Sequence, residues 1–422
     1  MNLSQLEQTI LGDVWTSTWL WDTLTALCDD GHGRFAGTDD ERRAGEFMLR
    51  RFAEWGLHNV RAEPFDMPGW IRGPAQLTLL DGTTGPELPC MTLAGSPDGE
   101  VEAEIIDLGP GTPEAFGRLG ASIRGKIVLT GAAGPHRLER YARACEYGAV
   151  GFIFANNRPG QLIPAGSINF NDGPAPLPGI GIALEGAALL QRQLERGPVR
   201  ARLRAKGENE TVQARNIVAD LPGTDRDAGW IVVCGHYDGH DIAQGAQDNA
   251  TGTALVLETA RLLRPLCDWL KASFRFILFS GEEMGLYGSK HYVQAHTDEL
   301  SGIRLVFNAD IVGLAAPLVL MVQNSQPLAD SLNALPRNAL DIQVSGPQLV
   351  HYSDHYPFVQ AGDVPALMAV TSSPGEGRGW AHTQADTLDK LELRPLREAV
   401  AAAARVLLRL AVEPEHLPNK SG

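Results

Sequence analysis

The sequence has few cysteines and lacks the long apolar run of a membrane span. Its five cysteines, at positions 28, 90, 145, 234 and 267, are scattered along the chain, and no two have Cys-x-x-Cys spacing. We therefore expect buried free thiols. No apolar stretch approaches the length needed to cross a bilayer, so we expect no membrane partner.

Clustered basic residues are also missing. The chain has 36 Lys and Arg against 51 Asp and Glu, which gives a net charge of -15. A nucleic-acid partner is not expected, because phosphate binding requires grouped Lys and Arg, whereas a site that attracts cations is compatible with this charge. The segment Met1–Glu7 has neither the basic nor the apolar region of a signal peptide, and we expect a cytoplasmic protein. The oligomeric state stays open.

The composition is that of a soluble globular protein. Hydrophobic residues make up 44% and charged residues 21% of 422 residues, a length that predicts two or three structural units. The first segment, residues 1–67, has helical periodicity, with a helix expected over Asp39–Trp55 after a cap at Thr38 or Asp39. Residues 68–206 hold short β-like runs broken by Gly and Pro, which predict a separate inserted unit.

The inserted unit contains a predicted β-α-β motif. Its strands are expected at 126–130 and 150–154, with a helix over 138–147 between them. The unit offers no metal-type cluster and no nucleophile-base pair, so we expect it to serve as a lid or interaction module.

The last segment, residues 207–422, alternates strands and helices. Strands are expected at 216–221, 230–234, 274–279, 303–307 and 366–370, with helices at 252–263, 286–295 and 394–412. This alternation predicts an α/β fold in which a mainly parallel sheet lies between helices. Ligands in such folds gather beyond the carboxyl ends of the strands.

Chemically reactive side chains follow four of these predicted strands. They are His236, Asp238 and Asp248 after the second strand, Glu282 and Glu283 after the third, Asp310 after the fourth and His382 after the last. A single zinc site needs three or four ligands, and this set has more carboxylates than one zinc requires. Asp248, Glu283 and Asp310 with two zinc ions and a hydroxide sum to zero charge, which favours two metals. Glu282 remains as a candidate general base.

These motifs resemble those of the family-28 metallopeptidases, which use two zinc ions. The matching stretches are 235–238, 247–252, 279–289, 308–310 and 382–388, together with 33–38 near the N-terminus. The resemblance covers roughly residues 34–57 and 214–411, and residues 68–206 resemble the protease-associated domain that some members insert. It implies a three-layer zinc-exopeptidase fold with an inserted β-rich protease-associated domain.

The resemblance also implies a role for each residue. Asp248 bridges both metals, His236 and Asp310 complete one, and Glu283 and His382 complete the other. Glu282 is the general base, and Asp238 supports His236 from behind, which also agrees with the same-face spacing of positions 236 and 238 on a strand. The peptide bond between Asp248 and Asn249 is expected to be cis. Cobalt or manganese could replace zinc.

Several other residues are weighed but not assigned to the metals. His240 could reach a metal, but the family pattern gives it no such role, and we interpret it as a loop histidine. Asp354 is a candidate support, and His351, Tyr352 and His355 are possible pocket residues. Asp386 either orients His382 or caps the next turn.

The predicted function is removal of N-terminal residues from peptides by a dizinc aminopeptidase. The main alternative is a carboxypeptidase, for which Arg378 could hold the substrate's terminal carboxylate. An N-acyl or amide hydrolase on the same site is a further alternative. A glutaminyl cyclase is a less favoured alternative, since the fold does not settle the reaction. A non-catalytic binding protein on the same scaffold is also less favoured, because every ligand position and the base are present.

Overall fold

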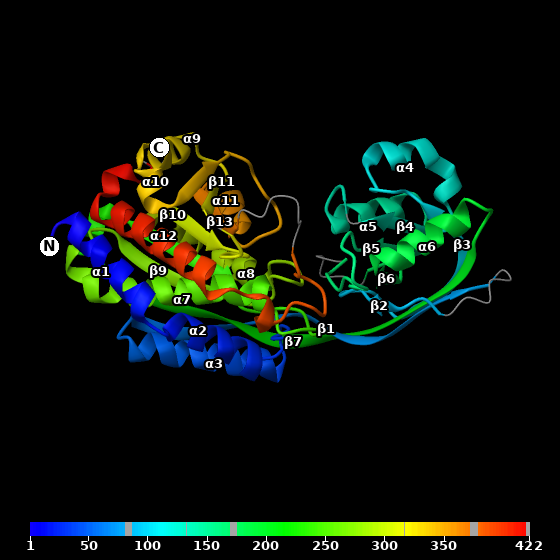
Figure 1. Ribbon diagram of the computed structural model, residues 1–422, viewed down its shortest axis with the longest axis horizontal. Helices are drawn as coiled ribbons and strands as arrows, with labels where there is room; N and C mark the ends of the chain where they lie inside the picture. Colours follow the sequence, from blue (N-terminus) through cyan, green and yellow to red (C-terminus); the bar gives the residue numbers. More distant parts are fainter. Residues whose placement is uncertain (81–86, 132, 169–174, 316, 372–378, 419–422) are drawn as a thin grey trace.

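Two bodies lie side by side and are joined by one long strand pair (Figure 1). The structure is a computed structural model that describes residues 1–80, 87–131, 133–168, 175–315, 317–371 and 379–418. The larger body holds both ends of the described chain, and the smaller body holds the residues between β1 (His58–Leu79) and β7 (Arg200–Leu221).

The larger body is built on a mixed, mainly parallel sheet. Its central strands β13, β10, β8 and β9 run parallel to one another, while β11 and β7 pair antiparallel with β13 and β9. The strands are β8 (Trp230–His236), β9 (Ser273–Phe279), β10 (Ile303–Ala309), β11 (Leu318–Val322), β12 (Ile342–Ser345) and β13 (Ala366–Thr371). The predicted strands at 230–234, 274–279, 303–307 and 366–370 are confirmed.

Helices cover both faces of this sheet and make three layers. The helices are α1 (Leu3–Thr16), α2 (Trp19–Thr25), α3 (Asp39–Glu54), α7 (Thr251–Leu263), α8 (Tyr287–Ala295), α9 (Gln326–Ala334), α10 (Arg337–Leu340), α11 (Tyr356–Gly362) and α12 (Leu393–Val412). Side chains alternate along β8, so that Ile231 and Val233 pack in the core with α7 and α12, while Val232 and Cys234 pack with α8 and α11. The predicted three-layer α/β fold is confirmed.

The first helix begins earlier than the hydrophobic pattern indicates. It starts at Leu3, after a capping box in which Asn2 and Gln5 bond each other's backbone N–H groups. The second predicted helix agrees with α3, where the Thr38 hydroxyl accepts from the backbone N–H of Glu41 at 3.3 Å. Capping chemistry therefore fixes both helix starts.

The smaller body is itself an α/β unit. Its strands are β2 (Cys90–Thr92), β3 (Gly99–Asp107), β4 (Ile127–Gly131), β5 (Gly151–Ala155) and β6 (Gly179–Ile182), and its helices are α4 (Pro113–Leu119), α5 (Arg137–Glu146) and α6 (Leu184–Leu194). Strands β4 and β5 pair in parallel across α5, which confirms the predicted β-α-β motif. The helix α6 packs on one face of the sheet, and α4 and α5 pack on the other.

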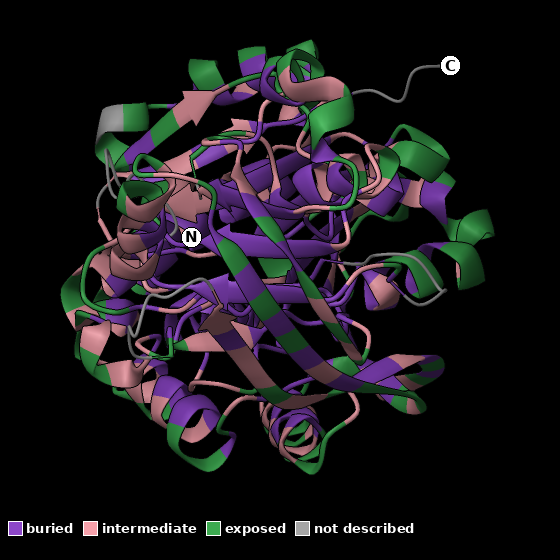
Figure 2. Cartoon of the chain, turned by 90° about the vertical axis from the view of Figure 1, so that its right-hand side faces the viewer, coloured by how far each residue is buried: buried purple, intermediate pink, exposed green. Residues whose placement is uncertain are grey.

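The two bodies share a continuous antiparallel ribbon. Strands β1 and β7 each have 22 residues, so the ribbon is roughly 70 Å long at the usual rise per residue. The limits expected for the inserted unit, residues 68 and 206, both fall inside these strands. In Figure 2, buried and exposed positions alternate along the long strands that cross in front of the buried sheet.

The described helices include none that combines the length and apolar character needed to cross a membrane.

A buried carboxyl beneath the sheet makes folding stability depend on pH. Glu41 on α3 is 2% exposed and contacts the Tyr237 hydroxyl, and burial raises its pKa to about 7. The raised pKa means that the folded state favours the uncharged acid. The contribution of Glu41 to the free energy of unfolding is fully present below the pKa of the unfolded state, near 4.5. It is lost as the pH rises through about 7.

We therefore expect Glu41→Gln to remove part of this pH dependence. Between pH 5 and pH 8 the wild-type chain should lose up to about 3 kcal/mol more unfolding free energy than the variant, because glutamine does not ionise. Urea unfolding at both pH values measures this difference, and Glu54→Gln at an exposed position of α3 is the matched control. Equal pH dependence in all three proteins would contradict the prediction.

Candidate metal centre

Acidic and histidine side chains from four strand ends converge on one site beside the sheet. His236 ends β8, Glu282 and Glu283 follow β9, Asp310 follows β10, and His382 lies on the loop after β13. The structure brings all of these predicted residues together with Asp248 around one narrow cleft. They are buried or nearly so, as expected where parallel strands end.

Asp248 lies between the two halves of this cluster. Its Oδ1 atom is 3.3 Å from His236 Nε2, and its Oδ2 atom is 3.0 Å from His382 Nε2. His236 Nε2 also lies 3.8 Å from Asp310 Oδ1, and His382 Nε2 lies 3.0 Å from Glu283 Oε2. The two carboxylate oxygens of Asp248 thus point to different histidines, as a bridging ligand requires.

Asp238 connects the first histidine to the glutamate pair. His236 Nδ1 is 3.1 Å from the main-chain oxygen of Asp238 and 3.6 Å from its carboxylate. The same carboxylate accepts the backbone N–H groups of Glu282 and Glu283 at 3.2 and 3.3 Å. Asp238 therefore orients His236 mainly through its backbone and uses its side chain to position the two glutamates.

The next residue, Asn249, holds the loop that carries Asp248 in place. The Asp248–Asn249 peptide bond is cis, as the family resemblance implies. The Asn249 amide donates to the Ala309 carbonyl at 2.9 Å, and its oxygen accepts from Gly252 and Ile311. A Cβ atom at Gly252 would lie 2.3 Å from the Ala309 oxygen, so this close approach requires glycine.

Asp310 is held by Ser353, which lies next to the candidate support Asp354 in the sequence. The Ser353 hydroxyl donates to Asp310 Oδ2 at 2.8 Å and accepts from the Asn308 amide at 2.6 Å. The neighbouring Asp354 is fully buried, and burial raises its pKa to about 7. His355 is buried against the Val350 carbonyl, whereas His351 is exposed.

Asp386 supports the bridging loop. It accepts hydrogen bonds from the backbone N–H groups of Gln247 and Asp248 at 2.6 and 3.1 Å. Burial raises the pKa of Asp386 to about 7. The Gln247 side chain in turn accepts from the Trp380 N–H at 2.9 Å, which ties the His382 loop to the Asp248 loop. Of the two roles expected for Asp386, orienting His382 or capping the next turn, neither is the one these bonds describe, because they hold the backbone of the Asp248 segment.

Arg34 is a buried support whose individual role the motif analysis did not identify. Its guanidinium donates to the carbonyls of Leu27, Tyr237, Gln244 and Gly245 at 2.7 to 2.9 Å. These bonds hold the segment after His236 against the segment before Asp248. A charged residue directly after Gly33 in an N-terminal loop was the available signal, but three of its four partners are more than 200 residues away in the chain.

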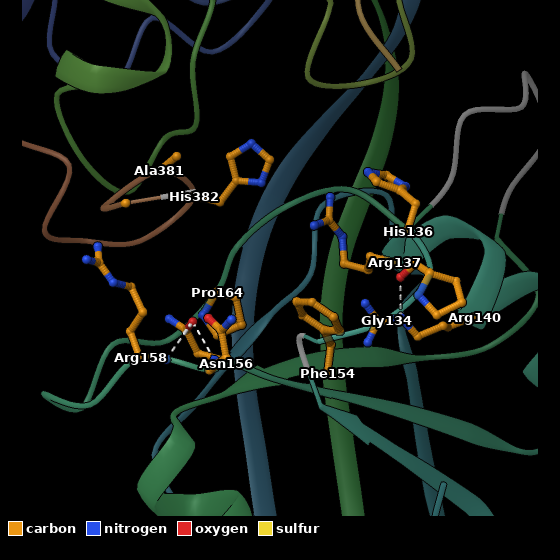
Figure 3. A pocket seen from close by; sticks show the side chains of 13 residues that line it. Gly134, His136, Arg137, Arg140, Phe154, Asn156, Arg158, Pro164, Ala381 and His382 are labelled. Carbon is orange, nitrogen blue, oxygen red and sulfur yellow. Dashed lines mark hydrogen bonds between the residues drawn. The ribbon is translucent and has the colours of Figure 1, made fainter. Parts of the chain in front are cut away.

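The smaller body contributes side chains to the cleft. His136 and Arg137, at the start of α5, line it together with Tyr352, whose ring stacks on His136 with 4.0 Å between centroids. An adjoining cavity of about 240 Å³ runs from His382 to Arg137, Arg140 and Arg158. Figure 3 shows His382 on one side of this cavity and His136 and Arg137 on the other. The insertion therefore forms one wall of the site.

His240 lies inside the cluster, which corrects its interpretation as an unassociated loop histidine. It is 4% exposed, and its Nε2 atom is 3.0 Å from Glu283 Oε2. The signal that could have found it is the His-x-x-x-His spacing of positions 236 and 240. The loop conformation that turns both rings to one place is not visible in the sequence.

The donor set fits divalent metal. Two groups of ligand atoms on buried or half-buried residues each lie within 4.8 Å of one another, formed by His240, Glu283 and His382 and by His236, Glu282 and Asp310. Glu283 Oε1 and His240 Nδ1 are buried and have no hydrogen-bond partner among the described residues, while His240 Nε2 faces Glu283 Oε2. Crowded buried carboxylates and unpaired imidazole nitrogens are costly unless cations satisfy them. Arg378 lies outside the described residues.

Comparison with known proteins agrees with this geometry. Residues 216–407 match the peptidase family M28, and residues 90–190 match the PA domain. The chain is 26% identical to aminopeptidase YwaD of Bacillus subtilis over 95% of its length and 87% of that protein. It is 27% identical to carboxypeptidase Q of Bos taurus over 69% of this chain, and the match spans 64% of that relative.

Solved structures have the same fold. A peptidase M28 precursor from Shewanella amazonensis superposes with a TM-score of 0.85 at 22% identity and covers 100% of this chain and 99% of its own. BSAP, a zinc aminopeptidase from Bacillus subtilis, gives a TM-score of 0.71 at 24% identity over 94% of this chain and 95% of its own. Residues 216–407 are therefore a peptidase family M28 domain, and residues 90–190 are an inserted PA domain.

Proposed function

We propose that this chain is a dizinc aminopeptidase that releases N-terminal residues from peptides. The observation that carries the proposal is the position of Asp248, whose two oxygens lie beside two different histidines. His236 and Asp310 would hold one ion, and Glu283 and His382 the other, with Asp248 shared. The relatives named above include a zinc aminopeptidase, which supports zinc as the metal.

Glu282 is the proposed proton carrier. It lies in the same cleft as the ligands, and its backbone N–H is held by Asp238. Bound zinc would supply a Lewis acid that polarises the scissile carbonyl and eases ionisation of water. Glu282 would accept the proton of the attacking water and deliver it to the leaving amine. Burial raises the pKa of Glu282 above its usual range, which favours uptake of the proton.

The narrow cleft supports exopeptidase action. His136, Arg137 and Tyr352 close it on the side opposite the strand ends, and the space directly at the ligands is only about 10 Å³. A folded protein segment does not fit between these walls. We propose peptides with free ends as the substrates.

A carboxypeptidase is the second candidate, and one observation favours it. Arg137 lines both the metal cleft and the adjoining cavity, and its Nε–H donates to the Ser167 carbonyl at 2.7 Å. A guanidinium at this place could hold a terminal carboxylate of the substrate. The similarity to carboxypeptidase Q also supports cleavage from the C-terminal end.

Blocked peptides distinguish the two candidates. We expect zinc-dependent release of the N-terminal residue from peptides with an amidated C-terminus, and loss of this release when the N-terminus is acetylated. Mass spectrometry of the products after incubation with and without chelator measures both. Release of C-terminal residues from acetylated peptides would overturn the aminopeptidase assignment and support the second candidate.

Replacing the proposed base should separate chemistry from metal binding. We expect Glu282→Gln to keep two zinc ions per chain, because glutamine preserves the side-chain shape, while kcat falls by about 10² to 10⁴. Elemental analysis and steady-state kinetics give the two readouts. Glu195→Gln on the surface of the smaller body is the matched control. A fully active Glu282→Gln protein would rule out this role.

Removing the shared carboxylate of Asp248 should release metal, in contrast to the change at Glu282. We expect Asp248→Ala to lose metal from both positions, since each position would lose a ligand and the balancing charge. Elemental analysis of the purified variant shows this loss, with exposed Asp298→Ala as control. Retention of both ions would contradict the bridging assignment.

A further inference from the structure

His240 occupies the second half of the metal cluster as closely as the expected ligands do. Its Nε2 atom and the His382 Nε2 atom are each 3.0 Å from the same oxygen, Glu283 Oε2. The two imidazole rings meet edge to face, with 4.6 Å between centroids and 84° between planes. His240 therefore shares the space into which Glu283 and His382 both point.

Two polar atoms of His240 and Glu283 lack partners among the described residues. Nδ1 of His240 and Oε1 of Glu283 are buried without a hydrogen bond, and His240 Nε2 has only Glu283 Oε2 beside it. Burying such atoms unpaired costs free energy, and the neutral imidazole nitrogen is a common zinc donor. A cation between these atoms would satisfy them together.

The loop that carries His240 is held in place from two sides. Asp241 is bonded to Arg72 of β1, with 2.9 Å between Arg72 Nε and Asp241 Oδ2. On the other side, Gly33 packs so closely that a Cβ atom there would lie 2.7 Å from the His240 carbonyl oxygen. The His240 ring also stacks on Phe35, with 6.2 Å between centroids and 27° between planes. Contacts on its backbone, on its ring and on Asp241 therefore hold the histidine in the cluster.

We propose that His240 is a further protein ligand of the second metal, in addition to Glu283, His382 and the shared Asp248. The inference rests on the proposed two-metal function. Four protein donors would fill a tetrahedral zinc shell, which is the pattern of tightly held zinc. The first metal, with His236, Asp310 and Asp248, would keep the open position beside Glu282.

The proposal implies that the two metal positions differ in their affinity for zinc. The His240 side would bind the first equivalent of zinc tightly, and the His236 side would bind the second more weakly. Water and substrate exchange would then be confined to the side on which Glu282 lies. This asymmetry is a property of metal binding itself and is measurable without turnover.

The test is stepwise zinc titration of the metal-free protein by calorimetry, combined with X-ray absorption at one equivalent of zinc. In wild type we expect a tight step followed by a weaker one, and two imidazoles on the first ion. His240→Phe keeps the aromatic contact with Phe35 but removes both nitrogens. It should weaken the tight step by more than about 100-fold and leave one imidazole on that ion.

Controls separate ligation from general damage. His382→Phe should weaken the same step, and His296→Phe, at a histidine that bonds Glu63 and Glu299, should leave both steps unchanged. If His240→Phe does not fold, which circular dichroism shows, His240→Gln takes its place with the same expectations. A variant that binds both ions with wild-type affinity, or an unchanged imidazole count, would overturn the proposal.

The outcome also separates this inference from the proposed function. Wild-type protein that saturates with one zinc would refute the two-metal function and the present inference together. If the wild-type protein binds two ions and His240→Phe binds them with the same affinities, only the role of His240 is refuted.

Discussion

The crowding of buried carboxylates at the ends of β8, β9 and β10 is the constraint on which the rest of the site depends. Asp238, Asp248, Glu283 and Asp310 are all buried or nearly so, and like charges held this closely repel one another strongly. Proteins accept such a group only where cations or strong hydrogen bonds offset the repulsion. The supporting contacts of Asn249, Ser353 and Asp386 hold acidic groups where they would not stay by themselves.

The strand ends and their residues could be predicted because the signals are local. A buried strand has a short apolar run, and the first polar residue after it lies at the sheet edge whatever the rest of the fold does. This rule placed His236, Glu282, Glu283 and Asp310 together. The residues that the sequence did not reveal are set by tertiary packing. His240 depends on a loop conformation fixed by Arg72 and Gly33, and Arg34 acts on carbonyls that no side-chain pattern marks.

The smaller body is part of the site in two ways that the sequence did not indicate. It supplies His136 and Arg137 as one wall of the cleft, and it supports the backbone of a proposed ligand, since the Ala165 N–H donates to the His382 carbonyl at 2.9 Å. The sequence shows no metal-type cluster and no nucleophile-base pair in residues 68–206 and led us to expect a lid or interaction module. Its contribution comes from its placement, which the pairing of β1 and β7 determines.

The ribbon formed by β1 and β7 sets the position of the smaller body relative to the larger one. Each residue of register shift would move the smaller body by about 3.3 Å and turn every side chain of the strand to the opposite face. The ladder from Phe65 opposite Ala214 to Leu79 opposite Ala201, with its single irregularity after Arg72, thus sets where the wall formed by the smaller body stands relative to the strand ends. An insertion or deletion of one residue in this ribbon would move that wall without changing a residue that lines the cleft.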